Sequence, residues 1–517
     1  MTKVNIRIFA SLALAALLMS ACGDDSEISP GGDSGVVGNT ATLAFTDGGA
    51  TLDPRAAHGA VPNTILLASY NTLVTNHIGE DGNQVDGEYD PALAESWEVS
   101  EDDLTWTFNL RNDVTFQSGN EFTAADVLWS FEGFELSSLY QLANIESVEA
   151  IDEHTVEFQL HTPQPVLPDY FGMMSIMDSA YLENEVDDID SYLASNAAGS
   201  GPYILESWDP SSEAVLTANP DYWGEEPAIQ QFTLRFVSEM TTQIQQLQQD
   251  DVQLIISIPP QNLADLEDDE NIEVIAADAG NTEWLSLNVQ VEPFDDVAVR
   301  QALAWATPYE EVIDSVLMGY GQRLESAISP ITPHYASEVW EYEYDPSMAR
   351  EVLEQAGYSE GDISFDAIVN NGDPFAADTA TILQDAYAEV GIDMSVQTLN
   401  SSQYEEQFFD SQALIGNWLS YINQPQYHFG WLLDSEGAAN FSNYENPEFD
   451  EIVRTAEFED EEIQAELWSE AQAILAEDVP WIYLYAPDVT VAHSSNLSGY
   501  YNYVSVVPRL HELYYED

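Results

Sequence analysis

The sequence predicts an α/β protein of two or three packed lobes, and three observations lead to that prediction. Short runs with strand-like alternation, such as 105–110 and 155–160, are interspersed with helical patterns. The 517 residues exceed the length of one ordinary domain. Hydrophobic residues make up 45% of the chain, which is enough to form cores and argues against global disorder.

The helical patterns are clearest in the second half of the chain. Apolar spacing predicts a helix over 299–318 that stops at Gly319. Similar patterns predict three more helices, at 349–356 with Gly357 as C-cap, at 380–390 and at 462–477. A strand is predicted at 392–399.

The charge is strongly unbalanced. The chain has 93 acidic residues against 10 basic ones, a net charge of −83, and beyond Arg7 its basic residues are eight arginines. An acidic surface can serve a cationic ligand, or it can keep a protein solvated in concentrated salt. Because the acids run along the whole chain, we favour the second interpretation and predict a halophilic source. Scattered arginines form no phosphate-binding patch, so nucleic acid is excluded as a partner.

The first 22 residues have the layout of a secretory signal. Residues 1–7 carry two positive charges, and 8–19 are an apolar run too short to span a bilayer. The run ends in LMSAC, which resembles a bacterial lipobox and predicts lipidation of Cys22, the only cysteine. A cleaved signal with a chance cysteine is the alternative. Residues 23–40 are small, polar and rich in Gly and Ser, and predict a flexible tether.

A dense motif lies at 94–130, AESWEVSEDDLTWTFNLRNDVTFQSGNEFTAADVLWS. It resembles the signature of the family-5 solute-binding proteins of ABC importers, which include oligopeptide-, dipeptide- and nickel-binding proteins. TLDP at 51–54, GSGPY at 199–203 and NPDYW at 219–223 resemble further family landmarks in the expected order. Most motif residues are expected to be scaffold: Trp97, Trp106, Phe108 and Phe116 as core, and Arg111 as a structural ion pair.

The resemblance implies a bilobal, three-domain fold of the type II periplasmic-binding-protein class, enlarged by an extra domain. Domain I is expected at 41–72, 204–283 and 485–517, domain II at 73–203, and domain III at 284–484. Ligand is expected in the cleft, where it stabilises the closed form by touching both sides.

In peptide-binding relatives, a Trp-x-x-Asp-x-x-x-Pro element lies beside the ligand, and its Asp neutralises the peptide's amino terminus. Here Trp418 and Pro425 keep the spacing, but Tyr421 takes the place of the Asp. A phenol supplies no full negative charge, so either a neighbouring acid such as Asp434 compensates or the ligand lacks that amine. The predicted ligand contacts are Asn417, Trp418, Leu419 and Tyr421.

Two other ligands are considered. Some relatives bind oligosaccharides, and sugar faces could stack on an aromatic set, with core or cleft wall as the plainer interpretation. The set is Trp418, Tyr421, Tyr427 and Trp431. Nickel is disfavoured, because His428 has no ligand-spaced partner and Gln426 occupies the position of the nickel binders' histidine. No metal or cofactor is therefore expected.

An enzyme is not expected, since the chain shows no G-x-S-x-G elbow, HExxH, Walker A or Rossmann glycine motif. The expected function is that of an extracytoplasmic, lipid-anchored and monomeric subunit that captures peptides and delivers them to membrane permease subunits. A receptor or chaperone that presents its ligand to another protein is the alternative class.

Overall fold

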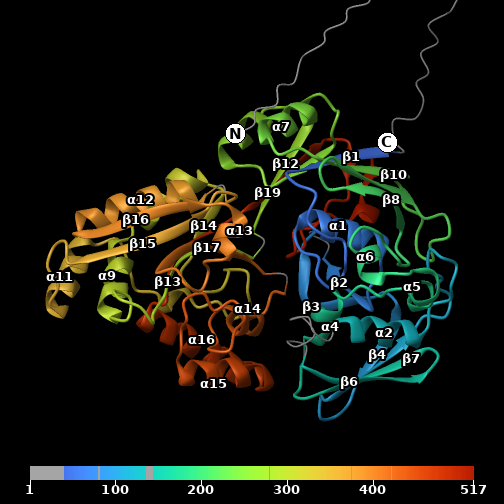
Figure 1. Ribbon diagram of the computed structural model, residues 1–517, viewed down its shortest axis with the longest axis horizontal. Coiled ribbons are helices and arrows are strands. Elements are labelled where there is room, and N and C mark those ends of the chain that lie inside the picture. The colour runs from blue at the N-terminus through green and yellow to red at the C-terminus, as the bar shows by residue number, and fades with distance from the viewer. Residues whose placement is uncertain are drawn as a thin grey trace, which may run out of the picture. The chain divides into compact units, whose positions relative to one another are not determined.

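The computed structural model describes residues 40–79, 82–134, 144–164, 166–278, 280–373, 375–420 and 422–516. The predicted signal segment, Cys22, most of the tether and Tyr421 therefore lie outside the described residues. Within them, no helix is both long enough and apolar enough to cross a membrane. Mixed strands and helices form the predicted α/β architecture (Figure 1).

A seven-stranded sheet collects strands from distant parts of the chain. Its order is β12 (Ile272–Ala277), β19 (Val489–Ser494), β11 (Leu254–Ile256), β1 (Thr40–Phe45), β10 (Gln231–Phe236), β9 (Glu213–Ala218) and β8 (Tyr203–Asp209). Leu43 and Phe45 enter one buried cluster and Ala44 another, so both faces of β1 are covered. The helices that follow these strands are α1 (Ala60–Ser69), α7 (Met240–Gln248) and α8 (Leu263–Glu267).

A six-stranded sheet forms the second core. Its order is β14 (Gly321–Arg323), β18 (Trp481–Pro487), β13 (Asn281–Leu287), β17 (Ala413–Leu419), β15 (Ile363–Asn370) and β16 (Ile392–Leu399). The helices in this part of the chain are α9 (Val297–Ala306), α10 (Tyr309–Val312), α11 (Pro346–Ala356), α12 (Ala376–Glu389), α13 (Ser401–Glu405), α14 (Pro425–Leu432), α15 (Pro447–Thr455) and α16 (Glu461–Asp478). Figure 1 shows α12 lying along β15 and β16.

A smaller four-stranded sheet carries the sequence motif. Its order is β4 (Ala94–Val99), β5 (Thr105–Leu110), β7 (Thr155–Leu160) and β6 (Ile145–Asp152), and β2 (Val74–Ile78) pairs with β3 (Gln84–Pro91) nearby in sequence. The helices here are α2 (Ala124–Phe134), α4 (Leu167–Phe171), α5 (Ser179–Glu185) and α6 (Ile189–Leu193), and a short pair β20 (Leu497–Ser498) and β21 (Tyr514–Tyr515) lies near the C-terminus.

Several local predictions are confirmed, and one is wrong. The strands at 105–110, 155–160 and 392–399 match β5, β7 and β16, and Gly357 ends α11 in the left-handed region with φ 97°. The continuous helix over 299–318 is wrong. It breaks at Thr307, which is extended because Pro308 follows it, and resumes as α10 and a π-helical turn over Ile313–Leu317.

The motif residues are mostly scaffold, as predicted. Trp106, Phe108 and Phe116 are buried. Trp97 stacks on Phe108 but is only half-buried, because it lies on the edge strand β4. The predicted domain limits at 283/284 and 484/485 fall inside β13 and β18, and the domain assignment itself stays a prediction.

Candidate functional site

A cavity of about 180 Å³ lies where the chain passes between the two larger sheets. Residues 257–259 and 488–490 line it from the side of the seven-stranded sheet, and β13, β17 and the end of β18 line it from the six-stranded sheet. Its lining contains Glu283, Asp373 and Asp488 but no basic residue. The electrostatics of this cavity therefore favour a cationic group.

Strands β13 and β17 build the floor of the cavity by antiparallel pairing. Glu283 lies opposite Asn417, and Trp284 lies opposite Gly416. A Cβ atom on Gly416 would come within 2.6 Å of the Trp284 ring, so glycine is needed for the two strands to approach. Opposite residues share one face of a sheet, which brings the side chains of Glu283 and Asn417 together.

The end of β17 has an open edge. Its pairing with β15 involves only Ala413 and Leu414, so no described strand covers the same edge from Gly416 onward. Leu287 N–H donates to Pro480 O on the other side of β13, so odd-numbered β13 residues bond away from β17. By this alternation, the backbone groups of Asn417 and Leu419 face the open edge.

Glu283 is the most unusual residue of the site. Its side chain is 3% exposed, and its Oε2 has no hydrogen-bond partner in the part of the chain that the structure describes. Burial raises the pKa of Glu283 well above its ordinary value, and the charge of Asp373 raises it further. The strand register against β18 shifts between Glu283 and Trp284, and such irregularities often redirect a side chain towards a site.

Two buried phenols that lie in the electrostatic field of Glu283 already form hydrogen bonds. Tyr485 exchanges a hydrogen bond of 2.8 Å with Thr379 Oγ1, and Tyr404 donates to Ile415 O at 2.6 Å. Burial and the negative charge of Glu283 raise the pKa of both phenols, which places the two rings within its field. Neither phenol supplies the donor that this carboxylate lacks.

Asp373 precedes α12 and is held by three donors. Its Oδ1 accepts from the N–H groups of Phe375 and Ala376 at 2.8 and 3.1 Å, and its Oδ2 accepts from Asn417 Nδ2 at 2.8 Å. The positive end of the α12 dipole is thereby already occupied by an anion. A ligand anion would find no free donor of this kind at Asp373.

The predicted contact residues divide into two groups. Asn417 lines the cavity, whereas Trp418 packs against the apolar clusters of both the six-stranded and the four-stranded sheet. Trp418 also contacts Trp431 and Tyr427, with ring centroids 6.0 and 6.4 Å apart, and Tyr427 is buried. These three rings of the aromatic set therefore pack largely on one another and form a wall rather than a free stacking platform for sugars.

Asp434 does not replace the missing acid. It is 5% exposed and forms an ion pair of 2.9 Å with Arg454, so its charge is already neutralised. His428 is buried as well, and burial lowers its pKa to about 3, which keeps the ring neutral. Among the described residues, no group of three or more His, Cys, Asp or Glu side chains is placed to hold a metal ion.

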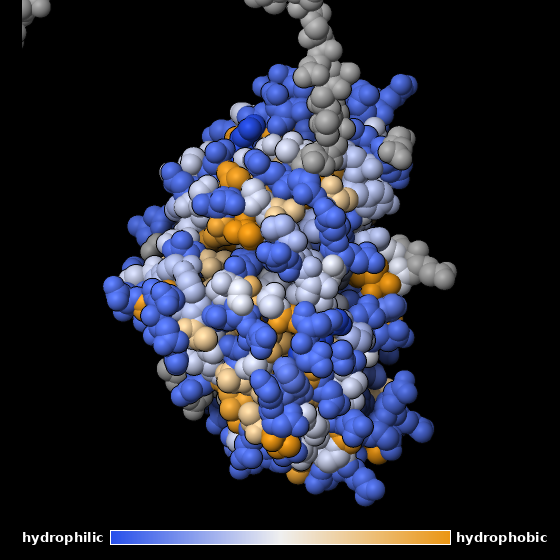
Figure 2. Space-filling model, turned by 90° about the vertical axis from the view of Figure 1, so that its right-hand side faces the viewer, coloured by the Kyte–Doolittle hydropathy of each residue, from blue (hydrophilic) through white to orange (hydrophobic). Residues whose placement is uncertain are grey.

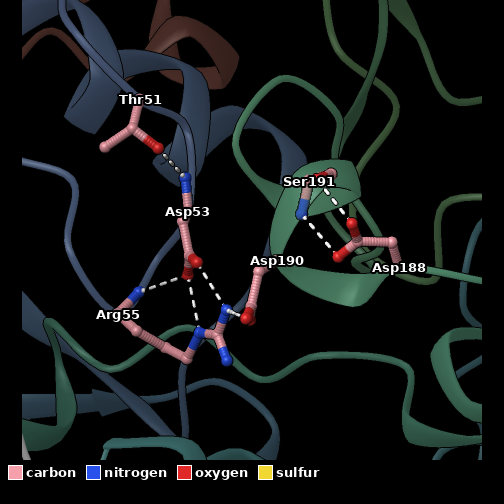
Figure 3. Close-up of polar contacts among 6 residues, drawn as sticks. All are labelled: Thr51, Asp53, Arg55, Asp188, Asp190 and Ser191. Atoms are coloured by element: carbon pink, nitrogen blue, oxygen red, sulfur yellow. Dashed lines mark hydrogen bonds and ion pairs between the residues drawn. The ribbon is translucent and has the colours of Figure 1, made fainter.

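Arginines elsewhere serve the scaffold. Arg55 bonds Asp53 of the TLDP segment and reaches Asp190 at 2.7 Å (Figure 3). Arg111 pairs with Asp113 and lies 4.6 Å from the Trp223 ring centroid, which confirms its expected structural role.

Sequence reasoning missed the acids of the cavity. Glu283 stands in the otherwise uncharged run TEWLSL, where a single acid is a weak sign of a special role. Because the chain has 93 acidic residues, the sequence alone does not distinguish this acid from the others. Only the fold shows that Glu283 and Asp373 face one cavity.

A polar cavity at the passage between two sheets, beside an open strand edge, is a feature of ligand-binding proteins. Comparison with known proteins agrees. Residues 88–440 match the family described as bacterial extracellular solute-binding proteins, family 5 Middle. The chain belongs to this family, the solute-binding proteins of ABC importers, whose members are extracytoplasmic.

Individual relatives cover most of the chain. A probable D,D-dipeptide-binding periplasmic protein of Escherichia coli is 27% identical over 87% of this chain and 89% of its own length. The di/tripeptide-binding protein 2 of Pseudomonas aeruginosa is 30% identical over 79% of this chain and 83% of its own length. The periplasmic binding protein DppA of Helicobacter pylori, solved with the peptide STSA, is 26% identical with a TM-score of 0.83, covering 93% of this chain and 98% of that protein.

Proposed function

We propose that this protein captures small peptides outside the cytoplasm and delivers them to the permease of an ABC importer. The observation that carries the proposal is the open edge of β17 beside the acidic cavity. An extended peptide can add to such an edge through its backbone, with the groups of Asn417 and Leu419 as partners. The peptide-binding relatives support this choice of ligand.

The first test identifies the ligand. The protein is purified in molar salt, the bound material is released, and mass spectrometry identifies it. Calorimetric titration then compares trialanine with maltotriose. Peptides in the released fraction and binding of trialanine alone support the proposal, whereas sugar in the cavity and binding of maltotriose alone contradict it.

The strand edge itself is tested with Leu419→Pro. This change removes the N–H group that faces the open edge and leaves the bonds to β13 intact. We expect trialanine affinity to fall about tenfold or more, because one backbone hydrogen bond to the peptide is lost and that bond also fixes the register of the peptide on the strand. Leu419→Ala is the matched control, since it keeps the N–H group and should bind nearly as well as the wild type.

The anchor and the partners complete the proposal. Lipidation of Cys22 and the tether of 23–40 would hold the binding domain near a membrane-embedded permease as a monomer that contributes binding without catalysis. Radiolabelled fatty acid should enter the wild-type chain but not Cys22→Ser in cells that process lipoproteins. Incorporation in both proteins would contradict the assignment of Cys22.

We further propose that the acidic surface is an adaptation to concentrated salt. Figure 2 shows a face on which hydrophilic residues predominate and apolar patches are small. With a net charge of −83, self-repulsion should destabilise the fold at low ionic strength. The melting temperature should rise between 0.2 and 2 M NaCl, and a flat profile would contradict the proposal.

A further inference from the structure

The geometry points to Glu283 and Asp373 as the pair that binds a positively charged group of the ligand, an ammonium or a guanidinium. This inference rests on the proposed function, because it assigns the recognition of the peptide's amine. It places the negative charge on β13 and before α12, on the face of the sheet that also carries Asn417. Position 421 carries a tyrosine, which supplies no carboxylate.

Three independent features support the pair. The first feature is that Glu283 is buried and lines a cavity of about 180 Å³, while its Oε2 has no hydrogen-bond partner within the described residues. Leaving a buried carboxylate unpaired costs free energy, so its persistence is explained if a ligand supplies the missing donor. Among the residues that the structure describes, no basic side chain lines the cavity to do so.

The second feature is the division of tasks between the two acids. Asp373 is fixed by Phe375, Ala376 and Asn417 and has a defined position. Glu283 has a free oxygen and lies in the field of Asp373. An ammonium has three donors and can contact both carboxylates at once, which relieves their mutual repulsion.

The third feature is the position of the pair relative to the open edge of β17. Asn417 belongs to both: its side chain bonds Asp373, and its backbone faces the edge where an extended peptide would pair. A peptide lying along residues 417–419 therefore has one end close to the acids. The strand edge binds the backbone, and the acids select a cationic end or side chain.

The test compares a ligand with and without its charge. Trialanine and N-acetyl-trialanine are titrated calorimetrically into the wild type and Glu283→Gln in 2 M NaCl at pH 7.5. We expect wild-type affinity for trialanine to exceed that for the acetylated peptide about tenfold or more. In Glu283→Gln, trialanine should lose about ten- to hundredfold in affinity, and the acetylated peptide less than twofold.

A proton readout separates this role from a structural one. Burial raises the pKa of Glu283 in the empty site, and a bound cation should lower it. Repeating the titration in buffers of different ionisation enthalpy should show proton release in the wild type and less of it in Glu283→Gln. Glu273→Gln, which changes an exposed strand acid of β12, is the matched control and should behave as the wild type.

The outcomes are distinguishable. If trialanine binds equally well to the wild type and Glu283→Gln, and acetylation has no effect, the pair does not bind the amine although peptide capture stands. If no peptide binds the wild type, the proposed function fails, and the pair is judged by spermidine at matched ionic strength. Stabilisation of the wild type by spermidine that is lost in Glu283→Gln supports the pair, and no stabilisation overturns it.

Discussion

Asp126 and Glu283 are both buried carboxylates, 4% and 3% exposed, but their surroundings differ completely. Asp126 accepts four hydrogen bonds, from the N–H and hydroxyl groups of Thr123 and Ser179. The Oε2 atom of Glu283 accepts none within the described residues and borders a cavity. Burial alone therefore does not distinguish these two acids: they differ in the missing hydrogen-bond partner beside open space.

Asp126→Ala should have the largest effect on stability. It removes the acceptor for two backbone N–H groups and two hydroxyls that tie α2 to α5, and leaves them unpaired. We expect a loss of about 2–4 kcal/mol in the free energy of unfolding. Urea denaturation measures it, with Glu101→Ala in an exposed turn as control. A loss no larger than that of the control would show that these bonds are dispensable.

Glu283→Gln should have the opposite sign in the empty protein. Because burial and Asp373 raise its pKa in the folded state, native Glu283 holds a proton that the unfolded chain releases. Its contribution to stability is therefore present below the ordinary pKa of about 4.5 and is lost as the pH rises towards the folded-state pKa. The amide has no such penalty.

We expect Glu283→Gln to gain about 1–3 kcal/mol over the wild type at pH 8 and little at pH 4. Urea denaturation across this pH range in constant salt checks it. A destabilised Glu283→Gln at pH 8 would mean that the carboxylate has a stabilising partner, and the comparison with Asp126 would then fail.

The contrast between the two acids also shows how far sequence reasoning reaches. Strands such as β5, β7 and β16 were predicted to the residue, because alternation along a half-buried strand is a local property. The prediction of a continuous helix over 299–318 was wrong at Pro308, where a local backbone restriction overrides apolar spacing. The family and its fold followed from the motif at 94–130 and are confirmed.

The candidate site could be predicted only in part. Asn417 was predicted as a ligand contact from its place beside the tryptophan of the family element, and it lines the cavity, while its contact with a ligand stays a prediction. Glu283 and Asp373 lie 90 residues apart in the sequence and meet only because β13 pairs with β17. A pairing of distant strands leaves no local signal, and a chain rich in acids hides the few that are buried.

Arg454→Met would turn a satisfied acid into one like Glu283. The change removes the ion pair of Asp434, whose side chain is 7% exposed. The backbone N–H of Glu436, at 2.8 Å, then remains as a donor to its carboxylate. Because Arg454 is 47% exposed, solvent screens part of the interaction, and we expect a loss of about 1–2 kcal/mol at pH 7.

Urea denaturation at pH 7 measures this loss. Arg454→Lys restores a cation beside Asp434 and should recover most of the stability. A lysine variant as unstable as Arg454→Met would show that the charge of residue 454 does not stabilise Asp434.

Glu457→Gln should have the smallest effect on ligand binding. It tests whether an unpaired buried acid that lies outside the cavity differs from Glu283. Glu457 is buried, and neither of its carboxylate oxygens has a hydrogen-bond partner within the described residues, but it is not among the residues that line the cavity of Glu283. Burial and the charge of Asp169 raise its pKa to about 8. At pH 6.5 it therefore carries a proton, and the amide reproduces its charge.

We expect trialanine affinity of Glu457→Gln to stay within about twofold of the wild type at pH 6.5, because no ligand contact is lost. Calorimetric titration of both proteins measures it. As the pH rises from about 4.5 to about 8, the wild type loses stability because the unfolded chain releases a proton that native Glu457 keeps, and the variant does not, so urea denaturation at pH 8 should separate them. A tenfold loss of affinity at pH 6.5 would instead mean that an unpaired buried acid affects the ligand without lining its cavity, and cavity contact would no longer distinguish Glu283.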